Sequence, residues 1–174
     1  MRPRFLTKVI MLGALSALMC GSLPASQSPS RRQARRPSVC GNPMFNCHLD
    51  PNSSFQPFDL PFRIPRGAVI FDTELFYAII LKSVAVTDSD CDTFVPESER
   101  LQAQALFPDH KVFTDRCIEP GNLFYTNVAE NHRIMAVYAG PTLAEAKRFL
   151  AAVKATGKFP GANLRRMRTG ENGT

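Results

Sequence analysis

The sequence predicts an α+β domain, a ferredoxin-like β-α-β-β-α-β two-layer sandwich with a four-stranded antiparallel sheet. Two observations lead to this fold class. Residues 132–168 follow the order strand, tight turn, capped helix, glycine stop and strand, and residues 76–117 repeat that order more loosely. Two such halves in tandem place both helices on one face of the sheet. We therefore expect the opposite face to be open and to carry the function.

The first core strand is predicted over residues 76–86, FYAIILKSVAV, which are rich in β-branched and aromatic side chains. Side chains alternate between the two faces of a strand. One face receives Tyr77, Ile79 and Leu81, and the other receives Phe76, Ala78, Ile80 and Lys82. This alternation places Lys82 on the open face.

The first helix is predicted to begin at Pro96, which suits a first helical turn, and to end before Pro108. Leu101 and Ala105 supply its narrow apolar stripe. The second strand follows over residues 111–117, and a connection of polar and turn-forming residues leads from it to the third strand.

The third strand, before Gly140, presents Met135, Val137 and Ala139 on one face and Ile134, Ala136 and Tyr138 on the other. Thr142 and Glu145 have the spacing of a capping box at the start of the second helix. Gly157 has the conformational freedom to end that helix. In the last strand, residues 162–168, Leu164 is expected to face the core, so that Asn163 and Arg165 turn toward the open face.

The N-terminal part of the chain is predicted to be an export signal followed by a flexible linker. Basic residues precede an eleven-residue apolar run over residues 9–19, which is typical of a secretory signal peptide. A retained membrane anchor is the alternative. The expected organisation is a signal peptide at 1–25, a basic disordered linker at 26–39, a proline-rich arm at 40–67, the α/β domain at 68–169 and a disordered tail at 170–174.

Four cysteines remain after such a signal peptide, and an even number in an exported chain favours disulfide bonds. They are Cys40, Cys47, Cys91 and Cys117. Three pairings are open, and we favour the local one, Cys40–Cys47 with Cys91–Cys117. A zinc site that includes His48 is the alternative use of these thiols. Lipidation at Cys20 is a further alternative, and the chain is expected to contact a membrane only if it is lipidated there or retained.

The charge balance argues against nucleic acid as a partner. The whole chain has a net charge of +6, but residues 37–174 contain 14 basic and 15 acidic residues. A nearly neutral domain lacks the broad positive field that attracts phosphate backbones. The excess of positive charge lies in the signal region and in the linker.

The second half, with MAVYAGP followed by TLAEAKRFLAAVKATG and a strand, resembles the SPOR (sporulation-related repeat) family of bacterial envelope domains. The resemblance covers residues 76–168. It departs from the family pattern where the first strand ends without a glycine and where two connections are longer.

The resemblance implies an exported periplasmic or extracellular protein that binds peptidoglycan glycan strands through the sheet face opposite the helices. Carried over by strand parity, the binding residues would be Tyr138, Lys82, Arg116, Asn163 and Arg165. A tyrosine ring suits the apolar face of a sugar, and amide and guanidinium groups suit its hydroxyls and carboxylates.

No motif for catalysis or for a cofactor occurs in the sequence, so we expect a non-catalytic protein without a cofactor. Asp88, Asp90 and Asp92 are spaced like part of a calcium loop, but the glycine and the terminal glutamate of that loop are missing. The alternative function is a disulfide-stabilised module that binds another envelope protein and no glycan.

Overall fold

The structure is a computed structural model of the 174-residue chain and describes residues 36–43, 70–87, 90, 92–115 and 123–172. The chain divides into two units, Met1–Gln33 and Ala34–Thr174, and all described residues belong to the second. The expected signal peptide at 1–25 lies outside the described residues, as do most of the proline-rich arm and three of the four cysteines. No helix in the described part of the chain has the length and apolar character needed to span a bilayer.

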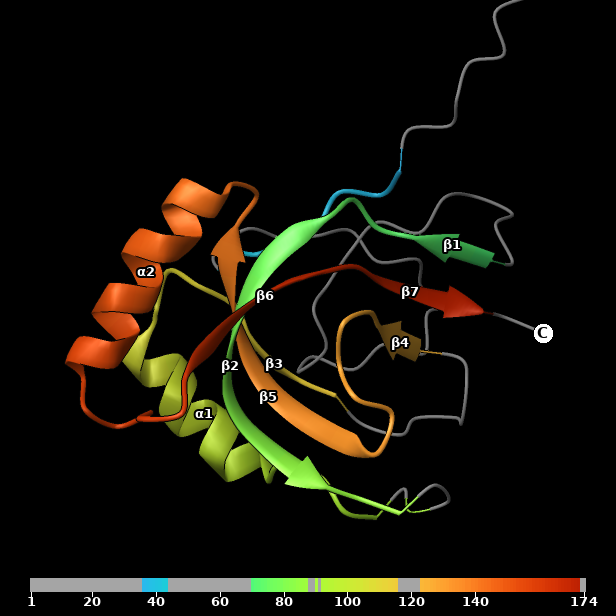
Figure 1. Cartoon of the computed structure of the whole chain (residues 1–174), viewed down its shortest axis with the longest axis horizontal. Coiled ribbons are helices and arrows are strands. Elements are labelled where there is room, and N and C mark those ends of the chain that lie inside the picture. Colours follow the sequence, from blue (N-terminus) through green and yellow to red (C-terminus); the bar gives the residue numbers. More distant parts are fainter. Residues whose placement is uncertain (1–35, 44–69, 88–89, 91, 116–122, 173–174) are drawn as a thin grey trace, which may run out of the picture. The chain divides into compact units, whose positions relative to one another are not determined.

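The described residues form a mixed α+β domain with two helices and two antiparallel sheets. The larger sheet has the strand order β3-β5-β2-β6. Its strands are β2 (Phe76–Ala85), β3 (Val112–Thr114), β5 (His132–Gly140) and β6 (Asn163–Met167), and the helices are α1 (Glu97–Leu106) and α2 (Leu143–Ala155). The α+β class and both helices are therefore confirmed. Both helices lie on one side of this sheet (Figure 1).

The helices cover a core on one face of the larger sheet. Ile79 of β2 and Val137 of β5 are fully buried there, together with Ala146 and Val153 of α2. The predicted capping box at the start of α2 is present, because the backbone N–H of Glu145 donates to the Thr142 hydroxyl and the backbone N–H of Thr142 donates to the Glu145 carboxylate. This cap satisfies two backbone N–H groups at the start of α2 and so defines where the helix begins.

The apolar stripe predicted for α1 lies on the wrong side of the helix. Leu101 is 54% exposed, whereas Ala103 is buried against the sheet. Arg100 is also buried, because its guanidinium donates to the Glu97 carboxylate and to the Val112 carbonyl. A paired arginine thus replaces an apolar side chain on the inner side of α1, which apolar periodicity does not reveal.

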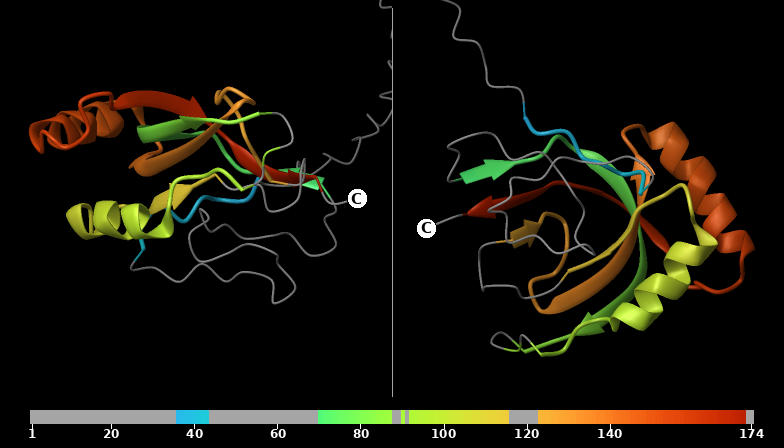
Figure 2. Two further views of the ribbon diagram at one scale, coloured as in Figure 1. Left: turned by 90° about the horizontal axis from the view of Figure 1, so that it is seen from below. Right: turned by 180° about the vertical axis from the view of Figure 1, so that it is seen from behind.

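The opposite face of the larger sheet is not open, as the sequence had predicted, but carries a second apolar core. Phe76, Ile80, Phe113 and Met167 are buried there. A second sheet with the strand order β1-β7-β4 contributes to this side; its strands are β1 (Ile70–Asp72), β4 (Leu123–Tyr125) and β7 (Thr169–Asn172). It lies on the side away from the helices (Figure 2), and the Tyr125 ring stacks on Phe113 at 5.4 Å.

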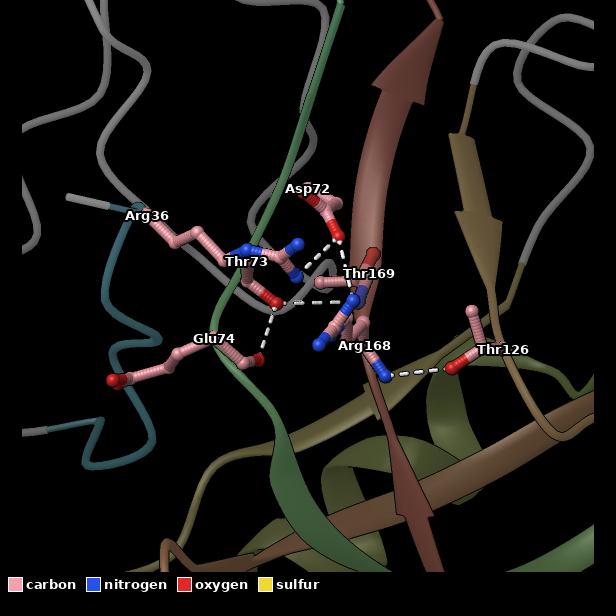
Figure 3. Close-up of polar contacts among 7 residues, drawn as sticks. All are labelled: Arg36, Asp72, Thr73, Glu74, Thr126, Arg168 and Thr169. Carbon is pink, nitrogen blue, oxygen red and sulfur yellow. Dashed lines mark hydrogen bonds and ion pairs between the residues drawn. The ribbon is translucent and has the colours of Figure 1, made fainter. Parts of the chain in front are cut away.

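The two sheets share one continuous two-stranded ribbon. β2 pairs with β6 in the larger sheet, and β1, which precedes β2, pairs with β7, which follows β6. The ribbon changes sheets at Thr73 and Arg168 (Figure 3). The backbone N–H of Thr73 donates to the Thr169 carbonyl, and the backbone N–H of Thr169 donates to the Thr73 hydroxyl. Asp72 accepts from both Arg36 and Arg168 beside this bend.

The expected domain boundaries shift at both ends. Residues 36–43, half of which had been placed in a disordered linker, lie against the domain: the Ser38 hydroxyl donates to the Glu74 carboxylate, and Val39 is buried. The expected disordered tail at 170–174 overlaps β7, which ends at Asn172. The ordered domain thus begins earlier and ends later than the sequence had suggested. Backbone hydrogen bonds from Glu74 and Lys111 hold residues 36–43, and pairing with β1 and β4 holds β7.

Candidate functional site

A shallow cleft of about 450 Å³ lies on the sheet face opposite the helices. Three strands and one turn supply its lining. These residues are Ile80 and Ser83 of β2, His132 and Ile134 of β5, Asn163 and Arg165 of β6, and Asn127, Val128 and Ala129 of the turn between β4 and β5. The cleft is the uncovered part of a face whose remainder is filled by the second core.

Asn163 and Arg165 lie where strand parity had predicted. β6 pairs with β2 in a regular register, with Arg165 opposite Ala78 and Leu164 opposite Ile79. Leu164 therefore packs against the helix-side core, while both neighbours face the cleft and are exposed. Two of the five residues proposed from the sequence thus meet in one site.

Lys82 lies on the wrong face for this site. The pairing of β2 with β5 shifts between Ile80 and Lys82, so that Ile80 lies opposite Ala136 but Lys82 lies opposite Met135. This irregularity places one extra residue in β2 and reverses the alternation after it. The Lys82 ammonium instead reaches α1 and pairs with the Glu99 carboxylate at 2.7 Å. The same shift brings Ser83 into the cleft.

Tyr138 lies on the predicted face but outside the cleft. Its ring is half-buried, packs at 5.9 Å from the Phe76 ring, and has the backbone of Gly41 against it. Burial raises the pKa of its phenol, and the carboxylates of Glu74 and Glu145 act in the same direction. The segment of residues 36–43 therefore lies on the ring surface that a sugar would need.

The remaining predicted site residues fall largely outside the described residues. Arg116, Cys47, Cys91 and Cys117 all lie there. Cys40 is described, but its three possible partners are not, so the use of these cysteines in disulfide bonds and their pairing stay predictions. Among the described residues, no three His, Cys, Asp or Glu side chains are grouped as metal ligands.

The cleft combines an apolar floor with hydrogen-bonding walls. The floor is formed by Ile80 and Ile134, which are largely buried, and Ser83, Asn127 and Asn163 add hydroxyl and amide groups. Arg165 contributes a permanent positive charge, and the described lining includes no carboxylate. Such a site suits a ligand with both an apolar surface and hydroxyl or anionic groups.

The turn that walls the cleft is held in a defined conformation. Asn127 has a φ of 62°, in the left-handed region that asparagine tolerates better than most side chains. Its side-chain amide donates to the Arg166 carbonyl, and the backbone N–H of Thr126 donates to the Arg168 carbonyl. These bonds attach the turn to β6 and fix the width of the cleft at that edge.

Three residues that line the cleft were not predicted from the sequence: Ser83, Asn127 and His132. Ser83 faces the cleft because of the irregularity in the pairing of β2 with β5. This irregularity has no local signature in the sequence. Asn127 stands in the dipeptide Thr126-Asn127 between two strands, a composition that signals a turn. A turn signal alone does not say which strand the turn folds against, so its place beside β6 required the structure.

The chain was compared with known proteins at three levels. No family model, no curated protein and no solved structure matches it.

Proposed function

We propose that this protein is an exported, non-catalytic cell-envelope protein that binds peptidoglycan glycan strands through the cleft. The observation that carries the proposal is the meeting of Asn163 and Arg165 in an open cleft on the sheet face away from the helices. The strand order β3-β5-β2-β6, with a helix after β2 and another after β5, supports a ferredoxin-like arrangement of the larger sheet. We infer the SPOR-like relationship from this order and from the sequence pattern.

The chemistry of the cleft supports a sugar polymer as ligand. A glycan strand presents hydroxyls and apolar ring faces, and its muramic acid units carry a lactyl carboxylate. Val128 of the turn is half-buried and offers apolar surface for a ring face beside the buried Ile80 and Ile134, while the Asn163 amide is placed to bond hydroxyls. The guanidinium of Arg165 is the group suited to the carboxylate. This assignment moves the centre of the binding site from Tyr138 to β6 and the adjoining turn.

The cleft is open to solvent and is not an enclosed cavity. It is bounded by β2, β5 and β6 on its floor and by the turn of residues 127–129 on one side. A polymer bound there requires no burial of its ends, whereas a small metabolite would be enclosed more fully. The proposed ligand is therefore a strand rather than a single sugar.

Binding to purified sacculi from which an amidase has removed the stem peptides tests this proposal. The variant Asn163→Ala/Arg165→Ala removes one amide and one cation from the cleft. Loss of one charge-assisted bond and one neutral bond should weaken retention by roughly 10- to 100-fold. The measurement is the fraction of protein that sediments with the sacculi.

The matched control is Lys82→Ala/Gln102→Ala, which also removes one cation and one amide, but from the helix side of the sheet, where both are exposed. It should bind like the unmodified protein. Equal retention of the cleft variant and the unmodified protein would contradict the proposal and would favour a protein partner instead.

A further inference from the structure

The part of the domain formed by α2 and β6 is strongly basic. Residues 143–168 contain seven Lys or Arg and a single Glu, whereas residues 37–142 contain seven Lys or Arg and 13 Asp or Glu. The domain as a whole is nearly neutral only because these two parts cancel. A sum over the domain therefore conceals an uneven distribution of charge, and local fields depend on that distribution.

The lysines of α2 lie on the flank of the helix that faces away from α1. Phe149 stacks on His110 at 3.7 Å and lies 5.5 Å from the Phe107 ring, so its flank of α2 faces the C-terminal end of α1 and the turn that follows it. Residues seven apart share one flank of a helix. Lys147 and Lys154 share the flank on the other side of the buried Ala146–Val153 line, toward β6, which α2 contacts.

β6 extends this basic surface on the same side of the sheet. Arg166 faces the helix side, opposite to Arg165, and its guanidinium lies 6.0 Å from the centre of the Tyr77 ring. Lys158 lies in the turn that connects α2 to β6. We define the α2–β6 basic face as Lys147, Lys154, Lys158 and Arg166, all of which are exposed.

The cations of this face are not neutralised by nearby acids. Within the described ranges, the ion pairs involve Arg36, Lys82, Arg100 and Arg168, and no member of the α2–β6 basic face. An apolar side chain accompanies them, because Leu143 at the start of α2 is 44% exposed. Four cations that form no ion pair with another described residue, beside an exposed leucine, make a surface suited to an anionic partner.

We propose that the α2–β6 basic face binds the anionic phospholipid headgroups of a membrane. A planar anionic surface contacts one side of a protein, and the α2–β6 basic face presents four exposed cations on one side of this domain, whereas residues 37–142 carry a net charge of −6. A membrane attracts the first part and repels the second, so the charge distribution orients the domain. Leu143 would enter the headgroup layer beside the cations.

An extended nucleic acid fits this distribution less well. A polyanion that tracks along a protein needs a continuous basic path, and the acidic remainder of the domain interrupts such a path. Three of the four cations are lysines, compact point charges that bind phosphate without the planar geometry that arginine brings to bases. The proposed surface is separate from the cleft, because Arg166 and Arg165 lie on opposite faces of β6.

Flotation of the full chain with phospholipid vesicles tests the proposal. Binding should be stronger to vesicles that contain phosphatidylglycerol than to pure phosphatidylcholine vesicles, and the difference should shrink as salt is added. Each cation contributes about fivefold to such binding. The variant Lys147→Gln/Lys154→Gln/Lys158→Gln should therefore lose roughly 100-fold of the preference for phosphatidylglycerol.

The matched control is Arg31→Gln/Arg32→Gln/Arg35→Gln, which removes three positive charges near the start of the chain and leaves α2 intact. It should keep the preference, as should the charge-conserving Lys147→Arg/Lys154→Arg/Lys158→Arg. Equal binding of the unmodified protein to both kinds of vesicle would overturn the proposal. Loss of the preference in Arg31→Gln/Arg32→Gln/Arg35→Gln, with the preference kept in Lys147→Gln/Lys154→Gln/Lys158→Gln, would also overturn it. Tighter binding of a short DNA duplex than of phosphatidylglycerol vesicles at the same salt would overturn the choice of a membrane.

Discussion

At the scale of single residues, the position of Leu81 decides which side chains belong to the cleft. The pairing of β2 with β5 passes from Ile80 to Lys82 with one residue unmatched. Before this point the alternation follows the pattern of the sequence, and after it the two faces exchange. Lys82 consequently pairs with Glu99 on the helix side, and Ser83 lines the cleft where Lys82 had been predicted.

The capping box at Thr142 gives a prediction at the same scale. The Thr142 hydroxyl donates to the Glu145 carboxylate at 2.6 Å, and this bond is the main cause of the lowered pKa of Glu145. A carboxyl with a lowered pKa stabilises the fold above its ordinary pKa of 4.5, and the contribution is lost as the pH falls through the lower pKa of the folded state.

We therefore expect acidification from about pH 6 to about pH 3 to lower the melting temperature of the unmodified protein more than that of Glu145→Gln. Thermal unfolding followed by circular dichroism measures the difference. Glu130→Gln, which removes an exposed carboxylate from a turn, is the control and should follow the unmodified protein. Parallel pH profiles for the Glu145→Gln variant and the unmodified protein would contradict the role of the cap.

At the scale of elements, the segment of residues 36–43 closes one end of the sheet face. The Gly41 carbonyl accepts from the backbone N–H of Lys111, and Gly41 lies so close to the Tyr138 ring that a Cβ there would overlap it. Glycine is therefore required by packing at this position. The segment explains why Tyr138, a natural partner for a sugar ring, is not in the cleft.

Gly41→Ala should destabilise the domain by about 1–3 kcal/mol, because the added methyl group overpacks against the ring. Chemical denaturation measures this loss. Gly161→Ala is the matched control, since a Cβ at Gly161 meets nothing within 4 Å. In the double variant Gly41→Ala/Tyr138→Ala the two losses should be less than additive. Additive losses would show that the segment does not rest on the ring.

How far the sequence predicts an element depends on its length and regularity. β6 pairs without interruption, so period two correctly assigned Leu164 to the core and Arg165 to the opposite face. The thirteen-residue helix α2 was predicted with its cap, because Thr142, Glu145 and Gly157 each have a distinct local chemistry. β1, β4 and β7 have three or four residues each, too few for a periodic signal, and so the second sheet was missed.

At the scale of the whole domain, one sheet separates two apolar cores. The helices bury one face, and the second sheet with residues 36–43 buries much of the other. The continuous ribbon that links β1–β7 with β2–β6 ties the two sheets together at Thr73 and Thr169 (Figure 3). A chain with only the predicted elements would have left that second face open, whereas the elements that the structure describes cover much of it beside the cleft.

The two proposed binding surfaces lie on opposite faces of the larger sheet. β6 presents Asn163 and Arg165 to the cleft on one face of the sheet and Arg166 to the basic surface on the other. A glycan strand and a membrane are therefore able to bind at the same time without competing for a residue. Each surface has its own variant, so the failure of one proposal leaves the other unaffected.

The most direct test of the central claim, that the cleft binds a glycan strand, is a titration of the isotopically labelled protein with soluble glycan chains free of stem peptides, followed by NMR. We predict that the side-chain amides of Asn163 and Asn127 and the guanidinium of Arg165 shift first and saturate together, while the Lys82 and Tyr138 signals stay in place. Shifts centred on Tyr138 or on the helices, or no shifts at saturating glycan, would contradict it.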